Sequence, residues 1–110
     1  MADPIPELLP GTLHLLILKA LHRAPLHGYA IAKRIKEASA DEFQVEEGSL
    51  YPALQRMLVK GWLAAEWGIS ETNRRARFYQ LTEEGRKQLK LEASQFDRTA
   101  AAIARVLRTA

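Results

Sequence analysis

The side chains best suited to chemistry in this sequence are basic and amide groups that fall in two places. Gln55 and Arg56 lie in a predicted helix over 48–60, and a polar stretch over 68–75 contains Asn73. The segment from residue 48 to residue 81 contains five basic residues and only two acidic residues, Glu66 and Glu71. Such long donors suit phosphates and the edges of nucleic-acid bases. The five basic residues are Arg56, Lys60, Arg74, Arg75 and Arg77.

The residue types and their spacing give little indication of a catalytic or metal-binding site. The chain has no cysteine, which excludes disulfides, thiolate catalysis and cysteine-ligated zinc. His14 and His22 are eight residues apart on one predicted helix, a separation of two turns that does not suit a shared metal ion. There is no glycine-rich phosphate loop and no motif that pairs a nucleophile with a base. We therefore expect no enzymatic activity, no metal and no cofactor.

Length and composition indicate one small domain. The 110 residues suit a single compact unit, and 47% hydrophobic residues are enough for a core. The formal net charge of +3 decides little until the charges are placed. The longest apolar stretch, over 13–24, is too short and too polar to span a bilayer. With no signal peptide visible, we expect a cytoplasmic protein without a membrane segment.

Three helices are predicted after a proline-broken arm over 1–10. The first begins at Gly11-Thr12, with Thr12 as N-cap, and the second runs from about 28 to 39, with His27 as a cap or turn residue. Its buried side contains Ile31, Ile35 and Ala38, and Lys33 faces outward. The third runs over 48–60, with Pro52 in its first turn and Gly61 after its end.

The period changes after Gly61 and predicts two strands, Trp62–Trp67 and Ala76–Thr82, joined by the polar loop. Trp62 and Trp67 are expected in the core. Thr82 then caps a long final helix whose first turn is acidic, as the helix dipole favours. Three helices followed by a two-stranded β-wing predict a mainly α fold, the winged helix-turn-helix, over 11–82, with a C-terminal helix over 83–110.

In this fold the third helix and the wing are the elements that meet DNA. Leu50, Leu54, Met57 and Leu58 form the core face of that helix. Ser49, Pro52, Ala53 and Arg56 are expected opposite, where small residues let a helix enter a major groove. The wing loop suits phosphates or the minor groove.

The final helix carries a heptad seam, with spacings of 4, 3, 4, 3 and 4 residues. The first helix also has leucines outside its main apolar stripe, Leu15 and Leu18. Both features predict a homodimer, in which the final helix packs on the partner's first and last helices. The expected dimerisation residues are Leu15, Leu18, Leu89, Ala93, Phe96, Ala100, Ile103 and Leu107.

Several motifs resemble the PadR family of bacterial transcriptional regulators. They are Gly11-Thr12-Leu13, Leu26-His27-Gly28-Tyr29, Gly48-Ser49-Leu50-Tyr51-Pro52-Ala53-Leu54, Lys60-Gly61-Trp62, Asn73-Arg74-Arg75-Ala76 and Phe78-Tyr79-Gln80-Leu81-Thr82. The resemblance covers about residues 9–90. It implies a winged-helix dimer that represses transcription, with the Leu-Tyr-Pro helix in the major groove and the wing on the DNA backbone.

By this resemblance, DNA contact is carried to Ser49, Tyr51, Pro52 and Arg74. Together with the residue types, it predicts a repressor that binds double-stranded DNA as a homodimer on a pseudo-palindromic operator. The alternative is a winged-helix module that binds protein and not DNA. A small apolar effector between subunits near Phe96 is a further possibility. The full predicted DNA-binding set is Lys33, Ser49, Tyr51, Pro52, Gln55, Arg56, Asn73, Arg74, Arg75 and Arg77.

Overall fold

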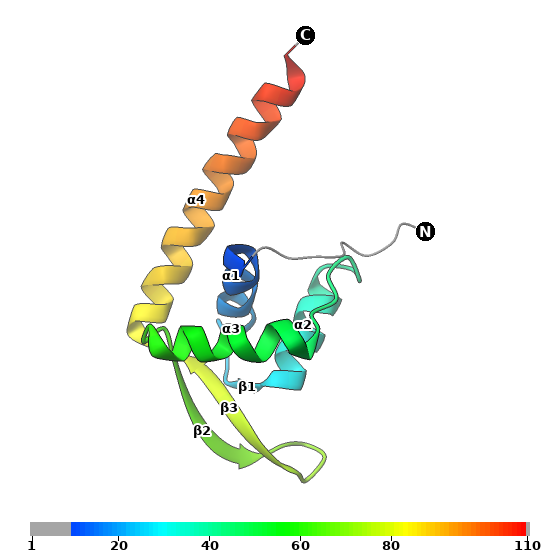
Figure 1. The fold of residues 1–110 in the computed structure, drawn as a ribbon, viewed down its shortest axis with the longest axis vertical. Coiled ribbons are helices and arrows are strands. Elements are labelled where there is room, and N and C mark those ends of the chain that lie inside the picture. The colour runs from blue at the N-terminus through cyan, green and yellow to red at the C-terminus, as the bar shows by residue number, and fades with distance from the viewer. Residues whose placement is uncertain (1–9, 110) are drawn as a thin grey trace.

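A computed structural model describes residues 10–109 and shows a winged helix (Figure 1). The elements are α1 (Pro10–Ala20), β1 (Leu26–His27), α2 (Gly28–Ala38), α3 (Glu47–Val59), β2 (Leu63–Ile69), β3 (Arg75–Leu81) and α4 (Glu83–Arg108). The first three helices gather together, the wing extends on one side, and α4 runs away on the other. The predicted mainly α winged helix-turn-helix is confirmed.

Most of the expected arm lies outside the described residues, because 1–9 are not described and Pro10 already begins α1. No helix among residues 10–109 combines the length and the apolar character needed to cross a membrane.

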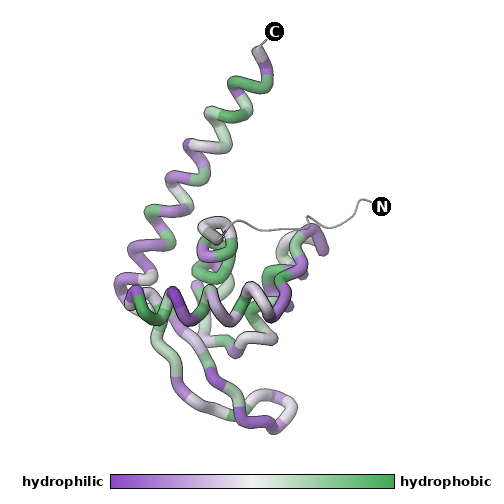
Figure 2. Tube along the Cα trace, viewed as in Figure 1, coloured by the Kyte–Doolittle hydropathy of each residue, from purple (hydrophilic) through white to green (hydrophobic). Residues whose placement is uncertain are grey.

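One apolar core holds α1, α2, α3 and the base of the wing together. Ile17, Ile31 and Met57 have no exposed surface, and Figure 2 shows α1 as largely hydrophobic. Leu18 is also fully buried, so it packs inside its own subunit and the expected partner contact is wrong; Leu15 is half-buried. Ala53 is buried too and does not lie opposite the core face of α3.

Three predicted positions near helix ends need correction. Because α1 begins at Pro10, Thr12 lies inside its first turn and is not the N-cap; proline is favoured at a first helical position. Because α3 begins at Glu47, Pro52 lies in its second turn, where the missing N–H leaves the Gly48 carbonyl without its helical donor. Ala38, at the end of α2, is exposed and not buried.

Other helix ends follow the predicted chemistry. The Ala30 N–H donates to His27 Nδ1 at 3.2 Å, which makes His27 the N-cap of α2. Gly61 has a φ of +80°, which only glycine adopts readily, and it ends α3. The Gly61 N–H donates to the Leu58 carbonyl and the Trp62 N–H to the Met57 carbonyl, a Schellman arrangement. The Gly85 N–H donates to Thr82 Oγ1 at 3.0 Å, so Thr82 caps α4 as expected.

The wing belongs to a three-stranded antiparallel sheet of order β1-β3-β2, one strand more than predicted. The extra strand, β1, has two residues, and it pairs Leu26 with Tyr79 and His27 with Phe78. So short a segment contains no alternation that a sequence pattern could reveal. In β2 and β3, Leu63 faces Leu81 and Trp67 faces Arg77.

Trp67 is exposed over 60% of its surface, so the expectation that it packs in the core is wrong. Trp62, at the base of the wing, is half-buried and packs against the core as expected. The difference arises because β2 and β3 extend beyond the helices that cover their base (Figure 1). Only their basal residues, Leu63, Tyr79 and Leu81, are buried.

His14 is the one buried polar side chain among the described residues, and it is only 8% exposed. Its ring meets Trp62 edge-on, with centroids 6.0 Å apart, and its Nε2 atom has no hydrogen-bond partner among residues 10–109. Burial lowers the pKa of His14, as do the positive charges of Arg56 and Lys60, against an opposing effect of Glu92. The neutral imidazole is therefore the form that the fold favours.

We expect stability to fall as pH decreases below about 6.5, because the unfolded chain then binds a proton that folded His14 resists. The stability contributed by neutral His14 is fully present above about pH 6.5, the pKa of the unfolded chain's histidine. It is lost as the pH falls towards the lowered pKa of His14 in the folded protein. In His14→Phe, which keeps an aromatic ring beside Trp62, the free energy of unfolding should vary less between pH 7 and pH 5. Urea unfolding at several pH values measures the free energy of unfolding of the unaltered protein and of the variant. Parallel pH profiles for the two proteins would contradict this.

Candidate nucleic-acid interface

The exposed side of α3 presents small and polar residues. Ser49, Pro52, Gln55 and Arg56 are exposed, and on the opposite side Leu50, Leu54 and Met57 anchor the helix in the core. Anchored in this way, the helix is a rigid element whose outer side is free to meet a ligand. Gln55 and Arg56 supply the hydrogen-bond donors there.

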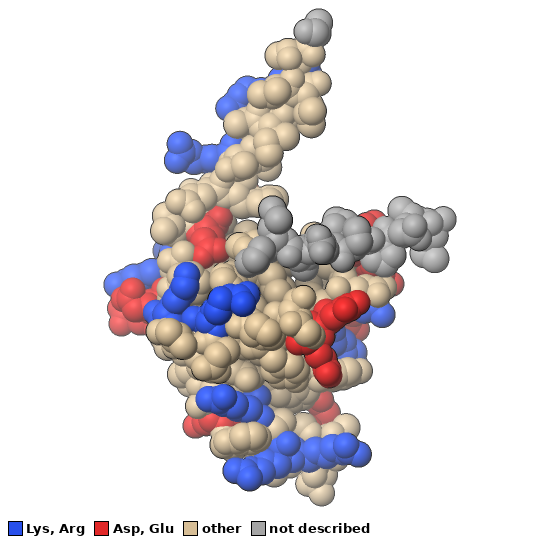
Figure 3. Space-filling view, in the orientation of Figure 1, with Lys and Arg blue, Asp and Glu red and all other residues tan. Residues whose placement is uncertain are grey.

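Charge is distributed unevenly around α3 and the wing. Figure 3 shows Lys and Arg side chains over the C-terminal half of α3 and on the wing, and acidic side chains near the start of α3. Exposed Arg56 and Lys60 account for the basic end of the helix, and exposed Glu46 and Glu47 for the acidic end. Because phosphate is repelled by carboxylates, the basic end and the wing suit a DNA backbone best.

Tyr51 lies where α3 crosses the start of α2. It is 46% exposed, and a Cβ atom at Gly28 would stand 2.7 Å from its hydroxyl oxygen. Any residue larger than glycine at position 28 would therefore displace the tyrosine ring. Partial burial raises the pKa of Tyr51, as does the negative charge of Glu47. The hydroxyl group stays protonated at neutral pH and is available as a hydrogen-bond donor.

His27 connects the start of α2 with the wing. Beyond capping α2 through Nδ1, its ring meets Phe78 of β3 edge-on at 5.4 Å, and its Nε2 lies 3.6 Å from Glu71 Oε1 in the wing loop. The β1–β3 pairing adds backbone hydrogen bonds at the same place. These contacts set the wing against the N-terminal end of α2.

One face of the wing alternates arginine and aromatic side chains. The Arg75 guanidinium lies 4.5 Å from the centroid of the Trp67 ring, and that of Arg77 lies 5.8 Å from the Tyr79 ring. Such cation–π contacts restrict the arginine side chains and leave their charge in place. Both arginines are exposed, so their N–H groups are available to an anion.

The wing loop is ordered by its own hydrogen bonds. The Ser70 N–H donates to the Arg74 carbonyl at 2.8 Å, and the Asn73 N–H donates to the Ser70 carbonyl at 2.9 Å. Asn73 has a φ of +61°, a conformation that asparagine tolerates better than most residues. Asn73 thus has a role in the turn itself, and Arg74 is presented from a defined loop.

A groove of about 860 Å³ lies between the wing and the starts of α2 and α3; we call it the wing groove. It brings together four of the predicted DNA-binding residues, Tyr51, Arg74, Arg75 and Arg77. Six others do not line it: Ser49, Pro52, Gln55 and Arg56 lie on the exposed side of α3, Lys33 lies on the exposed side of α2, and Asn73 lies at the wing tip.

Among the lining residues of the wing groove that were not predicted to bind DNA are two exposed aromatic residues, Tyr29 and Trp67. Tyr29 is 71% exposed on the first turn of α2, where its ring lies beside that of His27. An aromatic residue next to a helix cap was a usable signal for Tyr29. For Trp67 there was none, because alternation along a strand does not tell where the core beneath it ends.

The predicted dimerisation seam on α4 divides into two parts. Leu89 is buried in the subunit's core, so the expectation that it contacts a partner is wrong; Ala93 is half-buried. Beyond them Phe96, Ile103 and Leu107 are 56%, 53% and 78% exposed. In Figure 1 this part of α4 extends away from the rest of the structure. Among the described residues nothing covers it.

Comparisons with a protein family and with solved structures agree with the winged-helix geometry described above. The Transcriptional regulator PadR-like family matches residues 17–91, about two thirds of the chain. A transcriptional regulator from Clostridium thermocellum is 28% identical, with a TM-score of 0.78 over 86% of this chain and 92% of its own. A PadR family regulator from Clostridium difficile is 28% identical, with a TM-score of 0.74 over 86% and 97%. A PadR family regulator from Eggerthella lenta is 29% identical, with a TM-score of 0.76 over 91% of this chain and 85% of its own.

The matched segment contains β1, α2, α3 and both long strands, which are the elements that build the wing groove and the exposed side of α3. Family membership therefore rests on the region whose geometry suits DNA. The chain belongs to the PadR-like family of transcriptional regulators, whose members bind DNA.

Proposed function

We propose that this protein is a sequence-specific repressor that binds a pseudo-palindromic operator as a homodimer in the cytoplasm. The observation that carries the proposal is the wing groove, where Arg74, Arg75 and Arg77 lie near Tyr51. The groove adjoins α3, so phosphates held by the wing would bring the exposed side of α3 to base edges. Arginines suit phosphate because their guanidinium N–H groups bind it in pairs.

The homodimer proposal is supported by the apolar residues that α4 exposes beyond Ala93. Complete burial of a fully exposed apolar side chain contributes about 1.5–3 kcal/mol. Phe96 and Ile103 are still 56% and 53% exposed, so a second copy that covers them would gain part of this free energy from each. A twofold dimer would present two copies of α3 to two half-sites. The small apolar effector expected near Phe96 would then lie between subunits, and it stays a prediction.

Substitutions in the wing and in α3 should have different effects on DNA binding. In Arg74→Ala/Arg75→Ala we expect weaker binding to every duplex, because phosphate anchors are lost. The slope of log affinity against log salt should fall by about one unit per lost contact. In Gln55→Ala we expect a loss of about 1–3 kcal/mol on the preferred site only. Selection from random duplexes supplies that site, and salt titrations by fluorescence anisotropy measure both effects.

If the wing variant keeps its salt dependence but loses sequence preference, the two roles are reversed. If the unaltered protein selects no sequence from random DNA and its binding does not weaken with salt, the alternative of a protein-binding winged helix replaces this proposal. Lys87→Ala/Lys90→Ala, which removes two exposed positive charges from α4 outside the wing groove, is the control for the change in net charge.

Trp67 should act through Arg75. Trp67→Ala frees the Arg75 guanidinium, and we expect a two- to fivefold weaker affinity for all duplexes, since an exposed cation–π contact contributes about 0.5–1 kcal/mol. Trp67→Phe should restore most of this affinity. In an Arg75→Ala background the Trp67→Ala change should have no further effect. Additive losses in that double-mutant cycle would show that Trp67 acts independently of Arg75.

Charge placed in the seam should disrupt the dimer. In Phe96→Asp/Ile103→Asp, two buried carboxylates per subunit would cost several kcal/mol at the interface. Light scattering should then give a monomer mass at concentrations at which the unaltered protein is dimeric. Because both positions are exposed in the single subunit, circular dichroism should still show a folded winged helix. A dimer of unchanged stability would place the interface elsewhere.

A further inference from the structure

A glycine and a proline, the two residue types that weaken a helix most, lie four residues apart on the exposed side of α3. Gly48 is the second residue of the helix, and Pro52 lies inside it; both are exposed. The fold does not require glycine at position 48, because its φ is not positive and a Cβ atom there would meet no atom within 4 Å. A glycine that its own subunit does not need is typical of a place where a ligand approaches the backbone closely.

Together these two residues leave one backbone acceptor free. In an α-helix the carbonyl oxygen of residue 48 accepts a hydrogen bond from the N–H of residue 52, and proline has no N–H. Glycine places no side chain beside this oxygen. Residues four apart in a helix lie on the same face, so the free carbonyl of Gly48 and the ring of Pro52 share the side of α3 that faces away from the core.

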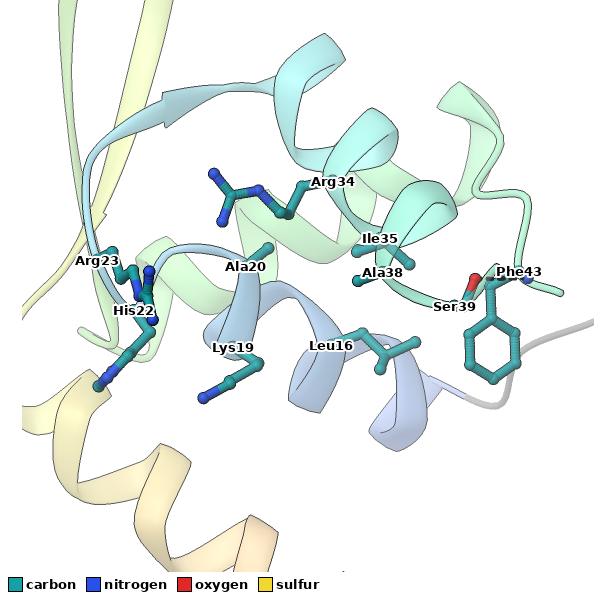
Figure 4. A pocket seen from close by; sticks show the side chains of 10 residues that line it. All are labelled: Leu16, Lys19, Ala20, His22, Arg23, Arg34, Ile35, Ala38, Ser39 and Phe43. Atoms are coloured by element: carbon teal, nitrogen blue, oxygen red, sulfur yellow. Dashed lines mark hydrogen bonds between the residues drawn. The ribbon is translucent and has the colours of Figure 1, made fainter. Parts of the chain in front are cut away.

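A backbone acceptor can recognise a ligand only if its helix is held in place. Leu50, Leu54 and Met57 are at most 2% exposed and anchor α3 in the core. Next to it, Figure 4 shows Leu16 of α1 and Ile35 of α2 pointing into the space between these two helices. No residue of α3 lines that space, a pocket of about 450 Å³. The exposed side of α3 is therefore separate from this pocket.

Charge along α3 indicates which part of a DNA duplex its start would meet. Glu46 and Glu47 are exposed beside Gly48, and the salt bridges found among residues 10–109 involve neither of them. Carboxylates repel phosphates and accept hydrogen bonds. At the other end, exposed Arg56 and Lys60 donate hydrogen bonds and attract phosphates. The start of α3 therefore suits hydrogen-bond donors on base edges and not the DNA backbone.

In the major groove only adenine and cytosine present such a donor, through their exocyclic amino groups, whereas guanine and thymine present acceptors. The N-terminal residues of a recognition helix are the ones that reach base edges. We propose that the Gly48 carbonyl oxygen accepts a hydrogen bond from the amino group of an adenine or a cytosine, so that Gly48 and Pro52 determine base preference at one position of each half-site. This proposal rests on the proposed DNA-binding function and names a group that reads the sequence.

The first test restores the missing donor. Pro52→Ala supplies an N–H for the Gly48 carbonyl oxygen and should raise the midpoint of thermal unfolding, because proline weakens a helix interior. Selection from random duplexes should show that this variant no longer prefers adenine or cytosine on one strand at one position of each half-site. Its affinity for unrelated duplexes should be unchanged, since the phosphate contacts remain.

A protein–DNA cycle identifies the group that is read. In one half-site, the selected adenine is replaced by purine, which lacks the N6 amino group, or the selected cytosine by 2-pyrimidinone, which lacks the N4 amino group. Fluorescence anisotropy should show about three- to tenfold weaker binding by the unaltered protein, as the loss of one hydrogen bond predicts. Pro52→Ala should bind the two duplexes equally. An equal loss in both proteins would mean that another group reads the amino group, which overturns the proposal.

Gly11 offers a matched control for the close approach at Gly48. It is also the second residue of its helix, exposed, and without an atom within 4 Å of a Cβ position. Gly11→Ala and Gly48→Ala should both raise the midpoint of thermal unfolding, because alanine favours a helix. Only Gly48→Ala should weaken binding to the selected site, by about tenfold, since its methyl group would hold the base away from the carbonyl oxygen. Unchanged affinity of Gly48→Ala would contradict the proposal.

Three further outcomes separate this proposal from others. If uracil in place of thymine at the same base pair weakens binding by the unaltered protein but not by Pro52→Ala, the proline ring reads the thymine methyl group, and the carbonyl proposal fails. If the unaltered protein selects a sequence but the cycle shows no coupling, only the role of Gly48 fails. If the unaltered protein selects no sequence at all, the proposed repressor function and the role of Gly48 fail together.

Discussion

The arrangement of this protein depends on one junction, where α3 ends, the wing leaves and returns, and α4 begins. Gly61 turns the chain with a φ of +80°, and the Thr82 hydroxyl donates to its carbonyl oxygen at 2.6 Å. The Thr82 N–H donates to the Trp62 carbonyl at 3.0 Å. At Gly85 the backbones come so close that a Cβ atom would collide with the Trp62 carbonyl oxygen. A few hydrogen bonds and two glycines therefore set the positions of three elements.

From that junction the wing extends beyond the helices, and its outer half has no core beneath it. Arginine and aromatic side chains stabilise this half by contacts on one face, and the loop closes on its own backbone. His27 and β1 then hold the wing against α2. The charged groups are thus fixed by local contacts before any ligand arrives, which lowers the conformational entropy lost when a ligand binds.

The same junction directs α4 away from the winged helix. Its first turns pack on the subunit through Leu89, and its last four turns expose Phe96, Ile103, Val106 and Leu107. An amphipathic helix with one uncovered apolar side is stable in proteins chiefly through packing, so this half of α4 favours association. The wing and the exposed part of α4 lie at opposite ends of the molecule (Figure 1).

Much of the fold could be predicted from local patterns. The 3.6-residue period located all four helices, and residue chemistry identified His27, Gly61 and Thr82 at helix ends, because caps and left-handed turns depend on neighbours close in the sequence. The starts of α1 and α3 were predicted too late: Thr12, predicted as the N-cap, is the third residue of α1, and α3 begins at Glu47, one residue before the predicted Gly48. The basic residues of the wing were also visible, since their types and spacing need no tertiary contact to be recognised.

Burial and proximity between distant segments were decided only by the tertiary structure. Leu18 and Leu89 are apolar, which suits either a core or a subunit interface. Only the packing of the helices against one another buries them inside the subunit. Trp67 has the position of a core residue in the alternating pattern of its strand, but it is exposed because the outer half of the sheet extends beyond the helices. The pairing of β1 with β3 joins residues more than fifty positions apart. A sequence determines which side chains are apolar, charged or able to cap; which of them meet depends on long-range contacts that no local period encodes.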